Sequence, residues 1–509
     1  MILIPILLPI VTGVLLLLFP VENERKRNIL IETAVIVNSA VTFCVLLGRP
    51  SGTLYLFTLG TSLSIALHID GLSMLFGGMV AFLWPFASLY AFEYMHHRGP
   101  ASGETSREAS VNSFMAFYTI TYGVTLGVAF SANLVTLYLF YETLTMVTLP
   151  LVMHYMDKDA RFATRKYLYY MIGGTAFAFI AMVFYTLLCT NLDFALGGNL
   201  DPAAIEQYGN VLLLIYLFGF FGFGVKAAVF PFHGWLPTAS VAPTPVTALL
   251  HAVAVVKSGV FAIIRLTWYC FGPAVLRGTW AQAIALCFVM FTVVYGSTMG
   301  VRETHFKRRL AYSTVSNLSY ILLGAMTLTP AGLAAGLAHM LAHAVMKISA
   351  FFCAGAVMHQ TGRNYIYELD GLGRKMPVTF TAFTIAGLSL TGAPLLAGFV
   401  SKWQLITALL GSGDVLGLIG VLALLYSALM TGIYMLTVSV RAFFPEVLSS
   451  VKGRNPVPAQ PEAADASDAQ DPNWLMKLPL IVFSVILIAV GCHAQPLLDF
   501  VSAIANGVL

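Results

Sequence analysis

The segment Gly224–Arg265 reads GVKAAVFPFHGWLPTASVAPTPVTALLHAVAVVKSGVFAIIR, and it decides the kind of fold. Its two lysines, Lys226 and Lys257, stand in apolar sequence that is long enough to cross a bilayer as helices. Several prolines, beginning with Pro231, lie between the lysines and break helical hydrogen bonding. Backbone groups freed in this way must be satisfied by protein or water inside a membrane. The segment therefore predicts membrane-spanning helices with a break beside a buried charge.

The composition of the whole chain agrees with this interpretation. Of its 509 residues, 58% are hydrophobic and 10% are charged, whereas a soluble domain needs roughly 25% charged residues. These values exclude a soluble enzyme, and a net charge of +4 gives no indication of nucleic-acid binding. The six cysteines form no CxxC pair, so we expect no iron–sulfur cluster, metal site or other cofactor in this chain.

Hydropathy divides the chain into fourteen expected spans, and their length requires helices because barrel strands are about ten residues long. The first run lacks a basic start and a cleavage site, so we interpret it as a span and not as a removable signal. The expected spans are Ile2–Phe19, Leu30–Leu47, Leu72–Phe92, Ser113–Phe130, Leu134–Tyr155, Leu168–Leu188, Val211–Phe230, Thr247–Phe271, Trp280–Gly300, Leu310–Leu328, Ala331–Met358, Val378–Leu410, Val415–Phe443 and Met476–Val490.

The distribution of Lys and Arg predicts the orientation of the chain. Of the 27 such residues, 20 lie in connections that follow odd-numbered spans, and only Arg49, Arg265 and Arg277 lie on the other side. Because positive residues collect on the cytoplasmic side, we expect both termini outside the cytoplasm. This bias and the lack of a targeting sequence fit a multi-pass protein of a prokaryotic plasma membrane.

Four lysines and one carboxylate lie well inside the predicted spans, whereas Glu32 is near a helix end and is expected to reach the membrane interface. A charge at this depth costs several kcal/mol and is by default a candidate for function. Four lysines cannot all be neutralised by one carboxylate, and an unpaired buried lysine loses its proton readily. We therefore expect a chain of protonatable sites, not only structural ion pairs. Its members are Glu142, Lys226, Lys257, Lys347 and Lys402.

Histidines extend this set. His339, His343 and Lys347 follow the spacing i, i+4, i+8, which predicts one polar stripe along the eleventh span. His251 is six residues before Lys257, about 240° around a helix, so these two are not expected to share a face. His251 is as compatible with a buried core histidine as with a relay member. His233, beside Pro231, is a candidate for proton uptake at the cytoplasmic side.

A second set of helix breakers, Gly392 and Pro394, precedes Lys402 in the twelfth span. The broken seventh and twelfth spans are five apart, so five-helix units that start at spans four and nine have opposite topology. This arrangement predicts an inverted repeat, as in transporters with paired broken helices. The expected units are 1–111 (spans one to three), 112–271 and 278–443 (the two repeats), a flexible cytoplasmic linker 444–475 and the last helix within 476–509.

These features resemble antiporter-like, proton-conducting membrane subunits. Such subunits occur in respiratory complex I, in Mrp-type cation/proton antiporters and in membrane-bound energy-converting hydrogenases. Beside the opening segment, the resemblance rests on HIDGLSMLF, LYLFYETLT, FKRRLAYSTVSNLSYILLG, HMLAHAVMKISAFFCAG and LSLTGAPLLAGFVSKW, which follow in that order from Asp70 to Lys402. It implies fourteen helices and a Glu142–Lys226 pair. It also implies that Lys257 links two half-channels and that Lys402 faces the exit.

The resulting hypothesis is a subunit that translocates protons, or exchanges Na⁺ for them, within a multisubunit redox-driven complex. Other membrane subunits are then expected as partners, and iron–sulfur clusters would reside in those partners. The alternative is a subunit of an Mrp-type cation/proton antiporter without a redox partner. The chain shows neither a redox nor a hydrolytic site, which disfavours an enzyme acting on a lipid or carbon dioxide.

Overall fold

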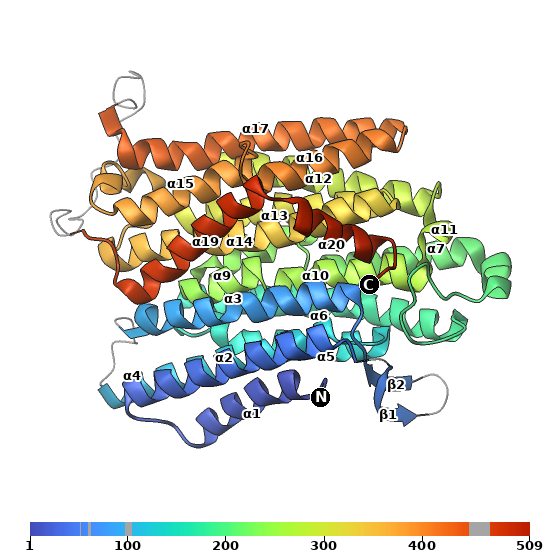
Figure 1. Ribbon diagram of the computed structural model, residues 1–509, viewed down its shortest axis with the longest axis horizontal. Helices are drawn as coiled ribbons and strands as arrows, with labels where there is room; N and C mark the ends of the chain where they lie inside the picture. Colours follow the sequence, from blue (N-terminus) through green and yellow to red (C-terminus); the bar gives the residue numbers. More distant parts are fainter. Residues whose placement is uncertain (51, 60–62, 97–103, 447–468) are drawn as a thin grey trace.

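The computed structural model describes residues 1–50, 52–59, 63–96, 104–446 and 469–509. Most helices run roughly along one direction, and the two ends of the chain lie at the same end of the bundle (Figure 1). In the described part of the chain, ten helices are long and apolar enough to cross a membrane. The prediction of a helical polytopic membrane protein is confirmed, whereas the number fourteen and the inverted repeats stay predictions.

The N-terminal part contains three long helices and one hairpin, which are α1 (Ile4–Leu18), α2 (Glu24–Gly48), β1 (Leu54–Leu59), β2 (Leu63–Leu67) and α3 (Gly71–His96). The strands are antiparallel, with Leu54 opposite Leu67 and Leu59 opposite Leu63. This hairpin was not predicted from the sequence. Its strands of six and five residues are too short to cross a bilayer, and the hairpin lies at the end of the bundle where both termini lie (Figure 1).

The remaining helices follow in two groups. The first comprises α4 (Glu104–Ala129), α5 (Leu134–Val152), α6 (Lys158–Leu188), α7 (Pro202–Gly224), α8 (Trp235–Thr238), α9 (Thr244–Ala252), α10 (Val255–Ile264) and α11 (Pro273–Leu276). The second comprises α12 (Trp280–Arg302), α13 (Phe306–Met326), α14 (Pro330–Thr361), α15 (Pro377–Thr391), α16 (Ala397–Gly411), α17 (Val415–Phe443), α19 (Trp474–Cys492) and α20 (Gln495–Ala505). Short helical turns are η1 (Phe232–Gly234), η2 (Ala239–Val241), η3 (Arg265–Phe271), η4 (Ile366–Glu368) and η5 (Leu372–Arg374).

Two interrupted helices carry lysines at their breaks. α7 ends at Gly224, and the chain passes Pro231 in short turns before α9 begins. α15 ends at Thr391, where Gly392 takes the left-handed conformation with φ 98° before α16 begins. Left-handed backbone is accessible to glycine at little cost, which explains the residue type at this end. Each break leaves helix-terminal carbonyl groups that other donors must satisfy.

The most buried helices lie in the middle of the bundle. The apolar window of Thr244–Phe271, which spans α9, α10 and the π-helical turn η3, is 100% buried, and that of α14 is 89% buried. The corresponding share is 39% in α2, α6 and α17. Polar side chains on α10 and α14 are therefore shielded from lipid on every side, which is where a membrane protein keeps functional charges.

The C-terminal part differs in detail from the expectation. The predicted linker 444–475 lies mostly outside the described residues, between 447 and 468. The last span was expected as one helix, Met476–Val490, but the structure has α19 followed by α20, with a break at His493. α19 and α20 both pack against α14. The division of the chain into the five expected units stays a prediction.

Candidate functional site

Lys226 and Glu142 occupy neighbouring positions near the break after α7. The Lys226 side chain is 1% exposed, and its ammonium donates a hydrogen bond to the carbonyl of Tyr141 and lies 3.4 Å from the centroid of the Tyr141 ring. One carboxylate oxygen of Glu142 is buried without a hydrogen-bond partner. Among the described residues, no ion pair joins Glu142 to Lys226. The two side chains are within electrostatic reach of each other, and the pairing itself stays a prediction.

Lys257 and His343 meet in the centre of the bundle. Both side chains are fully buried, and Lys257 Nζ lies 2.8 Å from His343 Nδ1. Lysine has only donors, so in this contact the charged lysine donates and His343 Nδ1 accepts. The second ring nitrogen of His343, Nε2, is buried without a partner. A proton can therefore pass directly between α10 and α14 at this point.

His339 continues the polar contacts toward α16. Its ring centroid lies 6.0 Å from that of His343, one turn away on α14. His339 Nδ1 lies 2.9 Å from the hydroxyl of Ser401, and Nε2 lies 3.3 Å from the amide oxygen of Asn317. Ser401 immediately precedes Lys402, so these contacts lead from Lys257 to the second broken helix. Sequence reasoning missed Ser401 and Asn317, although both are polar residues inside predicted spans.

Lys402 lies at the end of α15, although it belongs to α16. Its ammonium donates to the carbonyl of Leu390 at 2.6 Å and to that of Thr391 at 3.1 Å. These are the last carbonyls of α15, where a helix carries partial negative charge. A Cβ added at Gly392 would lie 3.2 Å from Lys402 Cδ, so the glycine also makes room for the side chain. Lys402 therefore satisfies the carbonyl groups at the broken helix end.

Lys347 and His251 lie beside this set of contacts. Lys347 is fully buried and donates to the carbonyl of Leu310 at 3.2 Å. His251 packs 4.8 Å from the ring of Phe351, and both its ring nitrogens are buried without partners. The prediction that His251 and Lys257 point to different faces assumed one continuous helix, and that premise is wrong. α9 ends at Ala252 and α10 begins at Val255, so the two residues belong to different helices.

His233 lies in η1, in the connection between α7 and α9. Its side chain is only 8% exposed and packs 5.6 Å from Phe230 and 4.7 Å from Tyr295. Burial, together with the nearby charge of Lys166, lowers the pKa of His233 to about 4. The imidazole is therefore neutral at neutral pH, and its burial and the charge of Lys166 both oppose proton uptake. Its role in proton uptake stays a prediction.

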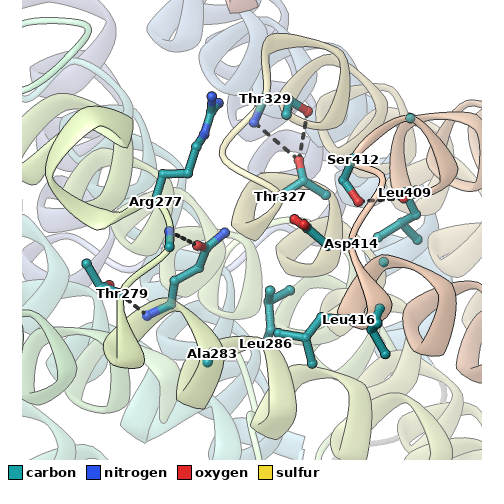
Figure 2. Close-up of a pocket in the computed structure, with 15 residues that line it drawn as sticks. Arg277, Thr279, Ala283, Leu286, Thr327, Thr329, Leu409, Ser412, Asp414 and Leu416 are labelled. Carbon is teal, nitrogen blue, oxygen red and sulfur yellow. Dashed lines mark hydrogen bonds between the residues drawn. The ribbon is translucent and has the colours of Figure 1, made fainter.

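A pocket with polar and apolar lining opens near the far end of α16. It measures about 680 Å³ and is lined by the connection before α12, the connection between α13 and α14, and the connection between α16 and α17. Figure 2 shows Arg277, Thr329, Ser412 and Asp414 around it, with Asp414 toward its centre. Leu409, two turns beyond Lys402 on α16, belongs to the lining. All three connections follow even-numbered predicted spans.

No group of three or more His, Cys, Asp or Glu side chains in the described part of the chain is arranged to hold a metal ion. The buried polar groups are instead lysines, histidines and hydroxyls joined by hydrogen bonds. Lysine and histidine side chains can exchange protons, whereas a metal site requires several anionic or imidazole ligands around one point.

Comparisons with known proteins place these residues in a family context. A family model described as NADH:quinone oxidoreductase/Mrp antiporter, TM, matches residues 131–431, a range that includes Glu142, Lys226, Lys257, His343 and Lys402. The chain is 29% identical over 449 residues to the Na(+)/H(+) antiporter A subunit of Alkalihalophilus pseudofirmus, covering 84% of this chain and 52% of that protein. It is 32% identical over 405 residues to NADH-quinone oxidoreductase subunit N of Desulforudis audaxviator, covering 77% of this chain and 76% of that protein.

The fold is also similar to a solved structure. A chain of the Mrp complex from Dietzia sp. superposes with a TM-score of 0.82 and 21% identity, covering 99% of this chain and 96% of that one. At this identity the likeness concerns the fold alone. The chain spans about half the length of the Na(+)/H(+) antiporter protein that it matches.

Proposed function

Because the chain belongs to the NADH:quinone oxidoreductase/Mrp antiporter family of transmembrane subunits, we propose that it carries protons through a buried relay in a multisubunit membrane complex. The observation that carries this proposal is the 2.8 Å contact between Lys257 and His343 in the fully buried centre of the bundle. A lysine without a carboxylate partner is costly at this depth, and proton exchange with a histidine gives it a function.

The relay runs from Lys257 through His343 and His339 to Ser401 and Lys402. Two of its steps are supported by hydrogen-bond distances, 2.8 Å between Lys257 and His343 and 2.9 Å between His339 and Ser401. Buried water bridges the wider step between the two histidines, whose ring centroids are 6.0 Å apart. Lys347 and His251 flank the relay, where Lys347 is held by the Leu310 carbonyl and His251 packs against Phe351.

Glu142 and Lys226 form the switch at the start of the path. The ammonium of Lys226 is held by Tyr141, and Glu142 keeps an unpartnered oxygen next to it. Movement of Lys226 from the Tyr141 carbonyl to Glu142 closes an ion pair and removes positive charge from the neighbourhood of Lys257. Protons then leave from Lys402 toward the pocket near Asp414, in which the C-terminal turn of α16 takes part.

The proposed location is a prokaryotic plasma membrane, with both termini outside the cytoplasm. The loop asymmetry of 20 against three basic residues supports this orientation. The pocket near Asp414 then opens outside, and the connection that contains His233 lies at the cytoplasmic side.

We propose a redox-driven complex as the setting, with electron carriers, including iron–sulfur clusters, in partner subunits. The relationship to subunit N of an NADH-quinone oxidoreductase, of which the chain covers 76%, favours this setting. A cation/proton antiporter driven by the ion gradient is the second candidate, and the relationship to a Na(+)/H(+) antiporter protein favours it. Both settings use the same relay.

The proposal is tested by ion flux in vesicles that contain the intact complex. We expect Glu142→Gln or Lys226→Ala to reduce proton flux at least about tenfold, equivalent to about 1.4 kcal/mol of added barrier, while assembly is retained. The matched controls are Glu206→Gln and Lys158→Ala, which make the same substitutions at exposed positions of α7 and α6. Parental flux in either relay variant would refute the switch. Flux that starts on addition of an electron donor identifies the redox setting, and flux driven by an imposed Na⁺ gradient alone identifies the antiporter.

A further inference from the structure

A second group of buried polar side chains lies in the N-terminal part of the bundle, outside the proposed relay. Three neighbouring helices, α2, α3 and α4, each present two polar residues at the spacing i, i+4, which places both on one helical face. The pairs are Asn28 and Glu32 on α2, Trp84 and Ser88 on α3, and Tyr118 and Tyr122 on α4.

Contacts between these side chains join the three helices. The hydroxyl of Ser88 donates to one carboxylate oxygen of Glu32 at 2.5 Å. The indole of Trp84 stacks on the ring of Tyr122, with centroids 4.8 Å apart, and lies 5.7 Å from that of Tyr118. The hydroxyl of Tyr118 is within electrostatic reach of the Glu32 carboxylate. Glu32 therefore belongs to a cluster and does not simply extend to the membrane interface.

Several polar atoms of this cluster are buried and have no hydrogen-bond partner in the protein. They are Glu32 Oε1, Asn28 Oδ1, Trp84 Nε1 and the hydroxyl oxygen of Tyr118. Buried polar atoms are almost always satisfied, by ordered water where the protein provides no partner. Donors and acceptors are both present here, and a water molecule can serve both. The group is therefore built to hold water beside the carboxylate.

A cavity gives access to Glu32 from one end of the bundle. It measures about 740 Å³ and lies between α2, α3 and the start of α19, with Glu32, Asn28 and Leu475 in its lining. The lining also includes Asn23 of the connection between α1 and α2, and Glu24 and Arg25 at the start of α2 contribute charge. Water can therefore reach the carboxylate without passing the relay lysines.

We propose that Glu32 is a second proton-binding site, hydrated by water molecules that Trp84 and Tyr118 hold. A proton is favoured over a metal cation because the indole N–H is only a donor and repels a cation, and because the site has a single carboxylate. Among the described residues near the site, Glu24 is bound by His96 of α3 at 2.7 Å, Arg25 lines the same cavity and Arg27 is buried on α2. α4 contributes the phenols of Tyr118 and Tyr122, and α1 contributes no charged residue.

Infrared difference spectroscopy on the intact complex tests this proposal without a flux measurement. At neutral pH we expect the C=O stretching band of a protonated carboxylic acid in the parent protein. The band should be lost in Glu32→Gln, whose amide keeps the shape of the side chain. Subtracting the variant from the parent removes the contributions of all other carboxyl groups, Glu142 included. Glu22→Gln, which removes an exposed carboxylate, serves as the matched control and should leave the band unchanged.

Two further variants test the geometry of the site. Ser88→Ala removes the hydrogen bond to Glu32 and should shift the band, while Trp84→Phe removes the indole N–H and should shift it through the shared water. A band that Glu32→Gln does not change would overturn the proposal, since Glu32 would then be ionised. Insensitivity to Trp84→Phe would overturn the hydrated arrangement. Neither outcome bears on the relay, because Lys257 and His343 lie on other helices.

Discussion

The ion pair between Asp70 and Arg265 should contribute strongly to stability, because it is buried at the end of the central α10. Arg265 is 1% exposed and Asp70 is 20% exposed. The guanidinium makes two hydrogen bonds to the carboxylate, at 2.5 and 2.7 Å, and one to the hydroxyl of Ser73 at 3.0 Å. The rings of Phe194, Phe261 and Tyr269 surround it, 4.4 to 5.1 Å from the guanidinium carbon.

The perturbation is Asp70→Asn, which removes the negative charge and leaves the buried guanidinium uncompensated. Breaking one partner of a buried pair costs about 3–5 kcal/mol, and we expect about 3 kcal/mol because the amide oxygen still accepts one hydrogen bond. Arg265→Met should cost less, since water reaches the remaining carboxylate. The double variant should lose less unfolding free energy than the sum of the two single variants. Each single variant leaves one charged group without its partner, and the double variant removes both groups.

A matched control is the pair of Asp370 and Arg441, which has a similar distance of 2.9 Å but lies at the surface, with Asp370 49% exposed. Exposed pairs contribute about 0–1 kcal/mol, so Asp370→Asn should have little effect. The assay is denaturant unfolding of the purified protein in detergent. Equal losses of unfolding free energy in Asp70→Asn and Asp370→Asn would refute the reasoning that burial sets the magnitude.

The pH dependence of this pair follows from its charges. Burial alone would raise the pKa of Asp70, but the charge and hydrogen bonds of Arg265 outweigh it and lower the pKa to about 2, from 3.8. The stabilisation is therefore fully present above about pH 4 and is lost as the pH falls toward 2. The free-energy difference between the parent and Asp70→Asn should stay constant from pH 5 to 8 and shrink only in strong acid.

Three further predictions concern the relay and the orientation. Lys257→Gln and His343→Gln should each lower proton flux at least about tenfold. The double variant should lower it no further, because all three variants lose the same contact. Additive losses would refute a shared step. Lys402→Arg should block proton flux, since arginine holds its proton too firmly to pass it on. The control Lys375→Arg, at an exposed position, should leave the flux unchanged. Parental flux in Lys402→Arg would exclude a protonation change at this position. A cysteine introduced in place of Glu22 should resist labelling from outside intact cells. Strong labelling would contradict the predicted orientation.

Much of the fold could be predicted because membrane helices follow from local composition. Apolar length gives the helices, and proline or glycine marks where some of them end, as at Pro231 and Gly392. The break between α9 and α10 could not be found this way, because Val253 and Ala254 include neither residue type. There the helix is interrupted in the buried centre of the bundle without a local sequence signal. The hairpin was missed because its short strands resemble an ordinary apolar connection.

The contacts of the candidate site depend on the packing of distant segments, which local patterns do not encode. Lys257 and His343 are 86 residues apart, and Asp70 and Arg265 are 195 apart. Each residue could be identified as an unusual charge or polar group inside apolar sequence. Its partner could not, because several buried groups on other helices were equally available. Glu32 shows the same limit, since its position near a helix end suggested contact with the interface and not with Ser88.

The stripe of His339, His343 and Lys347 shows how a correct helical pattern still leaves the route undetermined. Residues four apart differ by about 40° around a helix, so the three side chains turn through about 80°. That rotation is enough to reach three different neighbours: His339 contacts Ser401 of α16, His343 contacts Lys257 of α10, and Lys347 contacts Leu310 of α13. α14 therefore distributes its polar side chains among the surrounding helices. The polar contacts from α14 toward α16 pass through His339 and Ser401, whereas Lys347 makes its contact with α13.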